Sequence, residues 1–157
     1  ANDVAQKIMY NNLKAIGGVN YDRKEKKFAA EIYKTLRNPS LELESASEVQ
    51  PYGFRKGKGS TDVGDVSWMV PTARLRIATW VPGTSAHTWQ AVSAGGMSIG
   101  MKGMMNAAKV IAGTAVELYN DTETIKNAKK ELIERRGPKF NYYSLLGERK
   151  PPLDYRK

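Results

Sequence analysis

The feature that most constrains the fold is the stretch of residues 98–119, SIGMKGMMNAAKVIAGTAVELY. Its residues are apolar or small on nearly every side of a helix, and a helix that is apolar all round is usually buried. It contains Gly100, Gly103 and Gly113, and each glycine costs a helix interior about 1 kcal/mol relative to alanine. We expect close packing of another backbone, in a sheet, to offset that cost. The rest of the fold must therefore cover this helix.

Residues 73–81, ARLRIATWV, alternate and are rich in strand-forming types, which predicts a strand with Leu75, Ile77 and Thr79 on one face. Residues 66–70 are a weaker strand candidate. One or two strands do not make a stable sheet. The pattern therefore predicts an α/β fold whose sheet is completed by sequence that this chain does not contain.

Three further helices are expected, at residues 2–16, 24–36 and 122–136. Asn2 or Asp3 can cap the first, and Asp121 or Thr122 the last. Residues 38–60 lack a clear period, so we interpret them as a long connection, and such connections are often functional.

The bulk composition fits one domain. The chain has 157 residues, no cysteine and a net charge of +9, so disulfides and thiolate metal sites are excluded and a reducing compartment is favoured. We find no run of roughly 18 apolar residues and no secretory signal. These features predict a cytoplasmic protein that does not enter a membrane.

The net charge of +9 leaves three interpretations open. Acidic residues are interspersed among the lysines and arginines, and no RNA-recognition, zinc-finger or helix-turn-helix signature is present. A solvated basic surface is therefore favoured over a nucleic-acid-binding module. In the third interpretation, acidic surface on a partner or on another segment balances the charge.

Residues 57–68, GKGSTDVGDVSW, contain a glycine-rich run that is not a phosphate-binding P-loop. The spacing from Gly53 is one residue short, and Gly59 stands where serine or threonine must follow the lysine. The run is either a turn with a helix cap or a ligand-binding loop. Asp62 and Asp65 could share a helical face and hold a cation, although such pairs are common on exposed helices.

His87 is the only histidine, and it lies in GTSAHTWQ, directly after the predicted strand. Loops that follow strands carry ligands in α/β proteins, and imidazole is a common metal ligand. A zinc site needs at least three protein ligands, however, and Asp62 and Asp65 do not securely complete one with His87. The residues alone leave open whether His87 is a metal ligand or an ordinary surface residue.

Three blocks together resemble the C-terminal part of the aminoacylase/carboxypeptidase metallopeptidase family, and within it the p-aminobenzoyl-glutamate hydrolase branch. They are GSTDVGDVSWMVPTARLRIATWVPGTSAHTWQAVSAGG, MKGMMNAAKVIAGTAVELY and YYSLLGERKPPLDY. The resemblance covers nearly the whole chain, and GSTDVGDVSW with GTSAHTWQ at this spacing makes it specific. In one departure, Met101 stands where relatives often have histidine, so no auxiliary polar role is carried over to it.

The resemblance implies that residues 1–157 are a single, incomplete domain. This domain would be the C-terminal half of a zinc-exopeptidase-like mixed-sheet catalytic domain, without the lid or dimerisation domain. His87 would be the last ligand of a site for two divalent ions, zinc or manganese. The other ligands and the glutamate general base would lie in the missing N-terminal half, so no catalytic residue is expected here. The substrate cleft would be lined by Gly59, Ser60, Thr61 and Asp62.

The function that the resemblance implies is hydrolysis of an amide bond in an N-acyl or aminobenzoyl amino acid. The expected partners are this small substrate, the missing N-terminal half, and a second copy joined through the lid domain. The isolated chain would be inactive. Two alternatives remain at this point: a non-catalytic interaction or assembly subunit, and a basic nucleic-acid-binding module.

Overall fold

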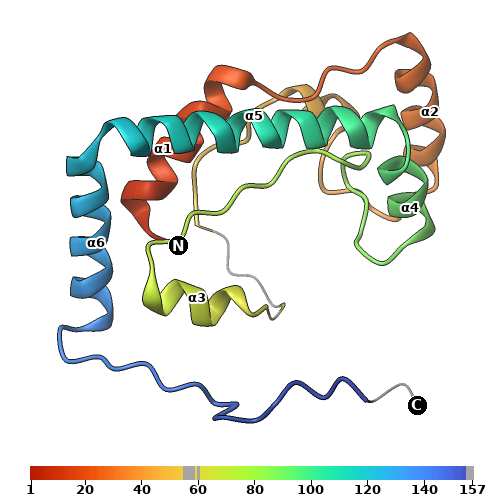
Figure 1. The fold of residues 1–157 in the computed structure, drawn as a ribbon. Coiled ribbons are helices and arrows are strands. Elements are labelled where there is room, and N and C mark those ends of the chain that lie inside the picture. The colour runs from red at the N-terminus through yellow and green to blue at the C-terminus, as the bar shows by residue number, and fades with distance from the viewer. Residues whose placement is uncertain (55–58, 60, 155–157) are drawn as a thin grey trace.

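The computed structural model describes residues 1–54, 59 and 61–154. Within these residues all regular structure is helical (Figure 1). The elements are α1 (Asp3–Ile16), α2 (Arg23–Lys34), the 3-10 helix η1 (Leu43–Ser47), α3 (Val63–Met69), α4 (Trp89–Gly95), α5 (Ser98–Asn120) and α6 (Thr122–Arg136).

The long helix α5 organises the molecule. It packs against α1, α4 and α6, and Figure 1 shows α6 at one of its ends and α2 with α4 at the other. Among the described residues, no helix is both long and apolar enough to cross a membrane.

The predicted helix starts are confirmed. The Asn2 side chain accepts a hydrogen bond from the Ala5 amide at 3.0 Å, and its own amide group donates to the Ala128 carbonyl at 2.9 Å. Asp121 caps α6 by accepting from the Thr124 amide at 3.0 Å. Because a cap satisfies amides that the first helical turn leaves free, it marks a helix start from local sequence alone.

The predicted α/β fold is wrong. Residues 73–81 form no strand, and the described residues contain no sheet. Arg74 exchanges two 2.8 Å hydrogen bonds with the Gln6 side chain instead of pairing with another backbone. The weaker candidate at residues 66–70 also fails, because most of it lies in α3. Alternation indicates which side chains share a face, but a strand forms only where a partner backbone supplies the ladder.

The prediction for α5 is half right. Its buried residues are Ile99, Gly100, Gly103, Val110 and Thr114. Other apolar side chains along it are more than half exposed, and these are Met101, Met104, Met105, Ile111 and Val116. The helix is therefore covered on one side only, which contradicts the expected burial all round.

The expected close backbone approach to α5 does occur, without a sheet. A Cβ atom on Gly103 would lie 2.6 Å from the Ala78 carbonyl oxygen and 2.8 Å from the Thr79 side chain. The non-helical chain at residues 78–79, which turns here through a 2.9 Å bond from the Thr79 amide to the Ile77 carbonyl, thus crosses directly over this helical glycine.

The main core lies at the α2–α4 end. Its buried members are Ala29, Ile32, Val81, Ala94 and Ile99. Partly buried side chains packed around them are Tyr21, Phe28, Tyr33, Leu43 and Trp80. The end of the predicted strand, at Val81, thus contributes to the core as coil.

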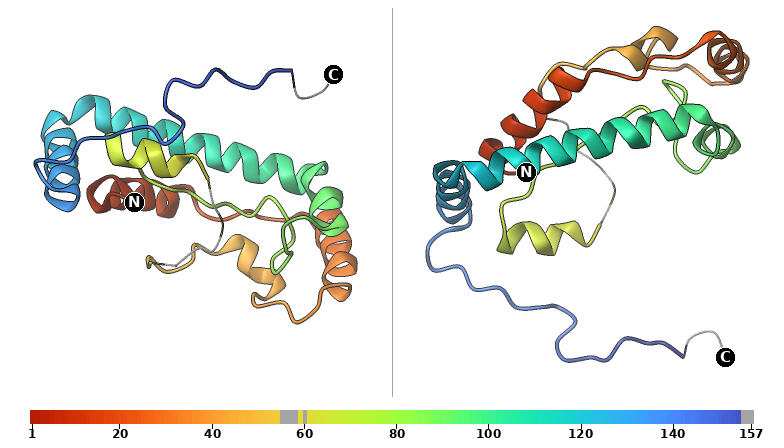
Figure 2. Two further views of the ribbon diagram at one scale, coloured as in Figure 1. Left: turned by 90° about the horizontal axis from the view of Figure 1, so that it is seen from below. Right: turned by 45° about the horizontal axis from the view of Figure 1, so that its top comes forward.

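After α6 the chain leaves the helices and runs past α3 (Figures 1 and 2). Phe140 stacks on Trp68 with ring centroids 5.0 Å apart, and Arg136 donates to the Trp68 carbonyl at 2.6 Å. Beyond these contacts, Leu145 and Leu153 are almost fully exposed.

An ion pair between a buried carboxylate and a partly exposed lysine joins α2 to α5. Glu25 is 5% exposed, and its carboxylate is 2.5 Å from the Lys102 ammonium. Burial is the largest single influence and opposes ionisation of Glu25, but its hydrogen bonds, above all from Lys102, and the charge of Lys102 together outweigh it, so the pKa of Glu25 is lowered. The neighbouring Tyr21 shows the opposite effect, since burial and then the Glu25 charge raise its pKa to about 12.

We expect this pair to make stability depend on pH. A carboxylate whose pKa is lower in the folded state stabilises the protein above its unfolded pKa, here 4.5, and that stabilisation is lost as the pH falls through the folded value. The melting temperature should therefore fall below about pH 4.5 more steeply in the parent chain than in Glu25→Gln. Melting curves between pH 3 and pH 7 measure this, and parallel curves for the two proteins would contradict it.

Candidate functional site

His87 lies in a short loop between the buried residue Val81 and α4. The loop is held at its start by a 3.1 Å bond from the Thr84 amide to the Val81 carbonyl. It is held at its end by Thr88, whose hydroxyl donates to the Ser85 carbonyl at 2.8 Å and accepts from the Ala91 amide at 3.3 Å. His87 is exposed to solvent in this loop.

Two residues of the loop have a left-handed backbone conformation, which is strained only at His87. His87 has a φ of 61°, in the left-handed region that few non-glycine residues adopt. Gly83 has a φ of 84°, and a Cβ there would lie 2.5 Å from the Pro39 Cβ. Strain of this kind is often found at functional sites.

The helix that follows the loop, α4, was missed by the sequence analysis. Thr88 before WQAV is a cap signal that could have revealed it. Trp89 opens the helix with its side chain 58% exposed, so this ring is not a core anchor beneath the loop.

The described residues do not by themselves fit a metal site. No three His, Asp or Glu side chains come together in the part of the chain that the structure describes, whereas a zinc site needs at least three protein ligands. His87 could supply one nitrogen donor.

The two aspartates of the GSTDVGDVSW block lie at the start of α3. Asp62 is the exposed N-cap residue, and Asp65 lies in the first turn. Asp65 interacts with Tyr142 of the C-terminal segment, whose pKa is raised by burial and by its hydrogen bond to this carboxylate. The structure therefore partners Asp65 with a tyrosine rather than with His87.

The predicted substrate loop borders a cavity of about 310 Å³. Gly59 and Thr61 belong to its lining, whereas Asp62 does not, and Ser60 lies outside the described residues. The other lining residues are Ala1, Val63, Gly64, Ser67, Thr72 and Arg74.

The cavity combines three hydroxyl groups with a guanidinium. The hydroxyls belong to Thr61, Ser67 and Thr72, and the guanidinium belongs to Arg74. Arg74 forms no ion pair with any described residue. A guanidinium beside hydroxyls suits a carboxylate, which it can bind through two parallel hydrogen bonds.

Sequence analysis missed Ser67, Thr72 and Arg74. Arg74 and Arg76 alternate with the apolar residues of ARLRI, and that pattern marked a polar face without indicating what it would line. No residue of the His87 loop lines this cavity, so the structure does not bring the predicted metal ligand and the predicted substrate loop into one pocket.

Comparison with known proteins identifies a relative. Over 123 residues the chain is 42% identical to one of the subunits of p-aminobenzoyl-glutamate hydrolase from Escherichia coli (strain K12). The chain is similar to a hydrolase subunit. The match covers 77% of this chain but only 23% of the length of that relative. No family model and no solved structure matches the chain.

This similarity supports the assignment to the family of that p-aminobenzoyl-glutamate hydrolase. Since the match covers 77% of the chain, it must include the central residues, among them Thr61 and His87. The metallopeptidase character that the resemblance implies stays a prediction.

Proposed function

We propose that this chain is part of a hydrolase that cleaves the amide bond of an aminobenzoyl or N-acyl amino acid. The observation that carries the proposal is the 42% identity to the p-aminobenzoyl-glutamate hydrolase of E. coli, whose name states such a substrate. The chain spans about a quarter of that relative's length, so further parts of the active site would come from sequence beyond these residues.

In this proposal the cavity at α3 binds the carboxylate of the substrate. Arg74 would bind the carboxylate, and the hydroxyls of Thr61, Ser67 and Thr72 would hydrogen-bond to neighbouring polar atoms. Gly59 also lines this cavity, and contacts of Ser60 and Asp62 with the substrate stay predictions. These groups bind and orient substrate, whereas the general base would be a residue outside this chain.

His87 would supply one ligand to a pair of divalent ions, zinc or manganese. Its exposure and its fixed, strained loop support this role, because the imidazole is available to ligands from outside the described residues. The relative is named as one subunit of its enzyme, so we propose that a partner chain also contributes. The absence of cysteine favours a cytoplasmic enzyme.

We expect His87→Gly to weaken metal binding in the assembled enzyme by at least roughly 10–100-fold, because loss of even an indirect partner of a metal ligand typically has that effect. Glycine is preferred to alanine here because it also tolerates the φ of 61°. Zinc and manganese content per chain, turnover of p-aminobenzoyl-glutamate and melting temperature should all be measured.

Ser85→Ala, an exposed change in the same loop, is the matched control and should leave metal content intact. Unchanged metal content in His87→Gly would refute the ligand assignment. Chelator-sensitive turnover by the 157-residue chain alone would instead show that the base and the remaining ligands are not outside it.

A non-catalytic assembly subunit is the second candidate. It is favoured by the exposed apolar side chains along α5 and by the lack of a complete metal donor set among the described residues. Binding to a partner chain that is unaffected by chelator, with no turnover in the assembled complex, would support it over the hydrolase.

A further inference from the structure

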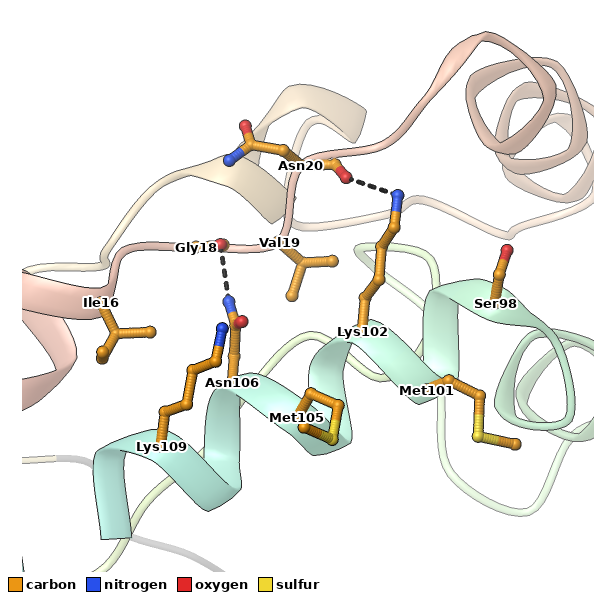
Figure 3. Close-up of a pocket in the computed structure, with 10 residues that line it drawn as sticks. All are labelled: Ile16, Gly18, Val19, Asn20, Ser98, Met101, Lys102, Met105, Asn106 and Lys109. Carbon is orange, nitrogen blue, oxygen red and sulfur yellow. Dashed lines mark hydrogen bonds between the residues drawn. The ribbon is translucent and has the colours of Figure 1, made fainter. Parts of the chain in front are cut away.

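A second cavity, of about 460 Å³, lies between α5 and residues 16–20 (Figure 3). Four polar side chains of α5 line one wall, namely Ser98, Lys102, Asn106 and Lys109. They are spaced by three or four residues, so they share one face of the helix. The volume is within the range of about 300–1,000 Å³ that is typical of small-molecule sites.

The opposite wall is held firmly in place. The Asn106 amide donates to the Gly18 carbonyl at 2.8 Å, and the Val19 amide donates to the Ala46 carbonyl at 2.6 Å. Gly18 packs so closely on the Ser47 backbone that a Cβ there would overlap it. The cavity is therefore formed in advance, which reduces the cost of binding a ligand.

The cavity has unused donors and one net positive charge. Lys102 donates to the Asn20 carbonyl at 3.1 Å and to the Glu25 carboxylate at 2.5 Å. An ammonium has three N–H groups, so one remains, and Glu25 neutralises the charge. Lys109 forms no ion pair with a described residue, and Figure 3 shows its side chain extending from α5 on the side that faces Gly18.

The rest of the lining is apolar. Ile16, Val19, Met101 and Met105 belong to it. Met101 and Met105 are each 51% exposed, and methionine adapts readily to the shape of a ligand. A ligand that covers these side chains would bind more tightly, because their apolar surface would be removed from water.

We propose that this cavity binds a small monocarboxylate with an apolar body. The carboxylate would accept a hydrogen bond from Lys109, whereas Lys102, two helical turns away, stays bound to Asn20 and Glu25. The apolar body would lie over Met101 and Met105. One net charge suits a monoanion, and the apolar walls disfavour a fully hydrated ion such as phosphate. No lining residue is shared with the cavity at Thr61 and Arg74, so this proposal does not depend on the hydrolase assignment.

The test is an NMR titration of the 157-residue chain with benzoate. Benzamide serves as the neutral ligand of the same shape, and inorganic phosphate as the anion without an apolar body. We expect a saturable benzoate Kd on the order of 1 mM, a normal affinity for so small a ligand. The largest amide shifts should be at Gly18, Val19 and Asn106, and benzamide and phosphate should bind about tenfold more weakly.

Two variants separate a specific site from the general basic charge. Lys109→Gln should weaken benzoate binding roughly tenfold, the value of one charge-assisted hydrogen bond. Lys129→Gln makes the same charge change at an exposed position of α6 and should leave binding unaltered. The spectra report whether each variant is folded.

Equal losses in the two variants would overturn the proposal, as would phosphate or benzamide binding as tightly as benzoate. Amide shifts that do not saturate, or that lie away from the cavity, would overturn it as well.

Discussion

Replacing Glu25 with alanine should lower the free energy of unfolding by roughly 2–4 kcal/mol. The carboxylate is 5% exposed, and it accepts from the Asp22 amide at 2.7 Å as well as from Lys102 at 2.5 Å. Its removal breaks the capping box at the start of α2 and leaves Lys102 without a counter-charge. Lys102 is 41% exposed, so water compensates part of the loss.

Urea denaturation of the parent chain and the variant measures this difference. Glu31→Ala is the matched control, since Glu31 lies on the same helix and pairs with Lys34 at the exposed surface. That variant should leave the unfolding midpoint almost unchanged, because exposed ion pairs contribute little. A similar loss of stability in both variants would show that the pair with the buried Glu25 carboxylate contributes no more than an exposed ion pair.

Replacing Gly103 with alanine should destabilise the chain by roughly 1–3 kcal/mol, the usual cost of overpacking. A glycine-to-alanine substitution in a helix interior usually raises stability instead, because alanine is favoured there over glycine by about 1 kcal/mol. At Gly103 the added methyl group would meet the Ala78 carbonyl oxygen at 2.6 Å, and neither backbone can move without disturbing its helix or the neighbouring core.

Gly64→Ala in α3 is the control for the helix effect alone. A Cβ at Gly64 meets nothing within 4 Å, so this variant should be stabilised by up to about 1 kcal/mol. Thermal or urea unfolding of both variants compares them directly. A gain in stability for Gly103→Ala would contradict the close approach of residues 78–79 to α5.

The candidate site was only partly visible in the sequence. The GSTDVGDVSW block indicated Gly59 and Thr61, and both line the cavity at α3. Ser67, Thr72 and Arg74 carry no local signal for such a role. They join the cavity because the chain turns after α3. The Gln6 side chain then holds Arg74 beside α1 through two hydrogen bonds.

The same distinction applies to the fold. Sequence alone determined where α1, α5 and α6 begin, because a helix forms its hydrogen bonds and caps among residues three or four apart. Asn2 and Asp121 could therefore be identified as helix caps from the neighbouring sequence alone. Only the tertiary structure decided the state of residues 73–81, because a strand depends on a partner that its own residues do not specify. It also decided which side of α5 is buried, since apolar or small residues occur on nearly every side of that helix and the neighbouring segments cover only the side of Gly103.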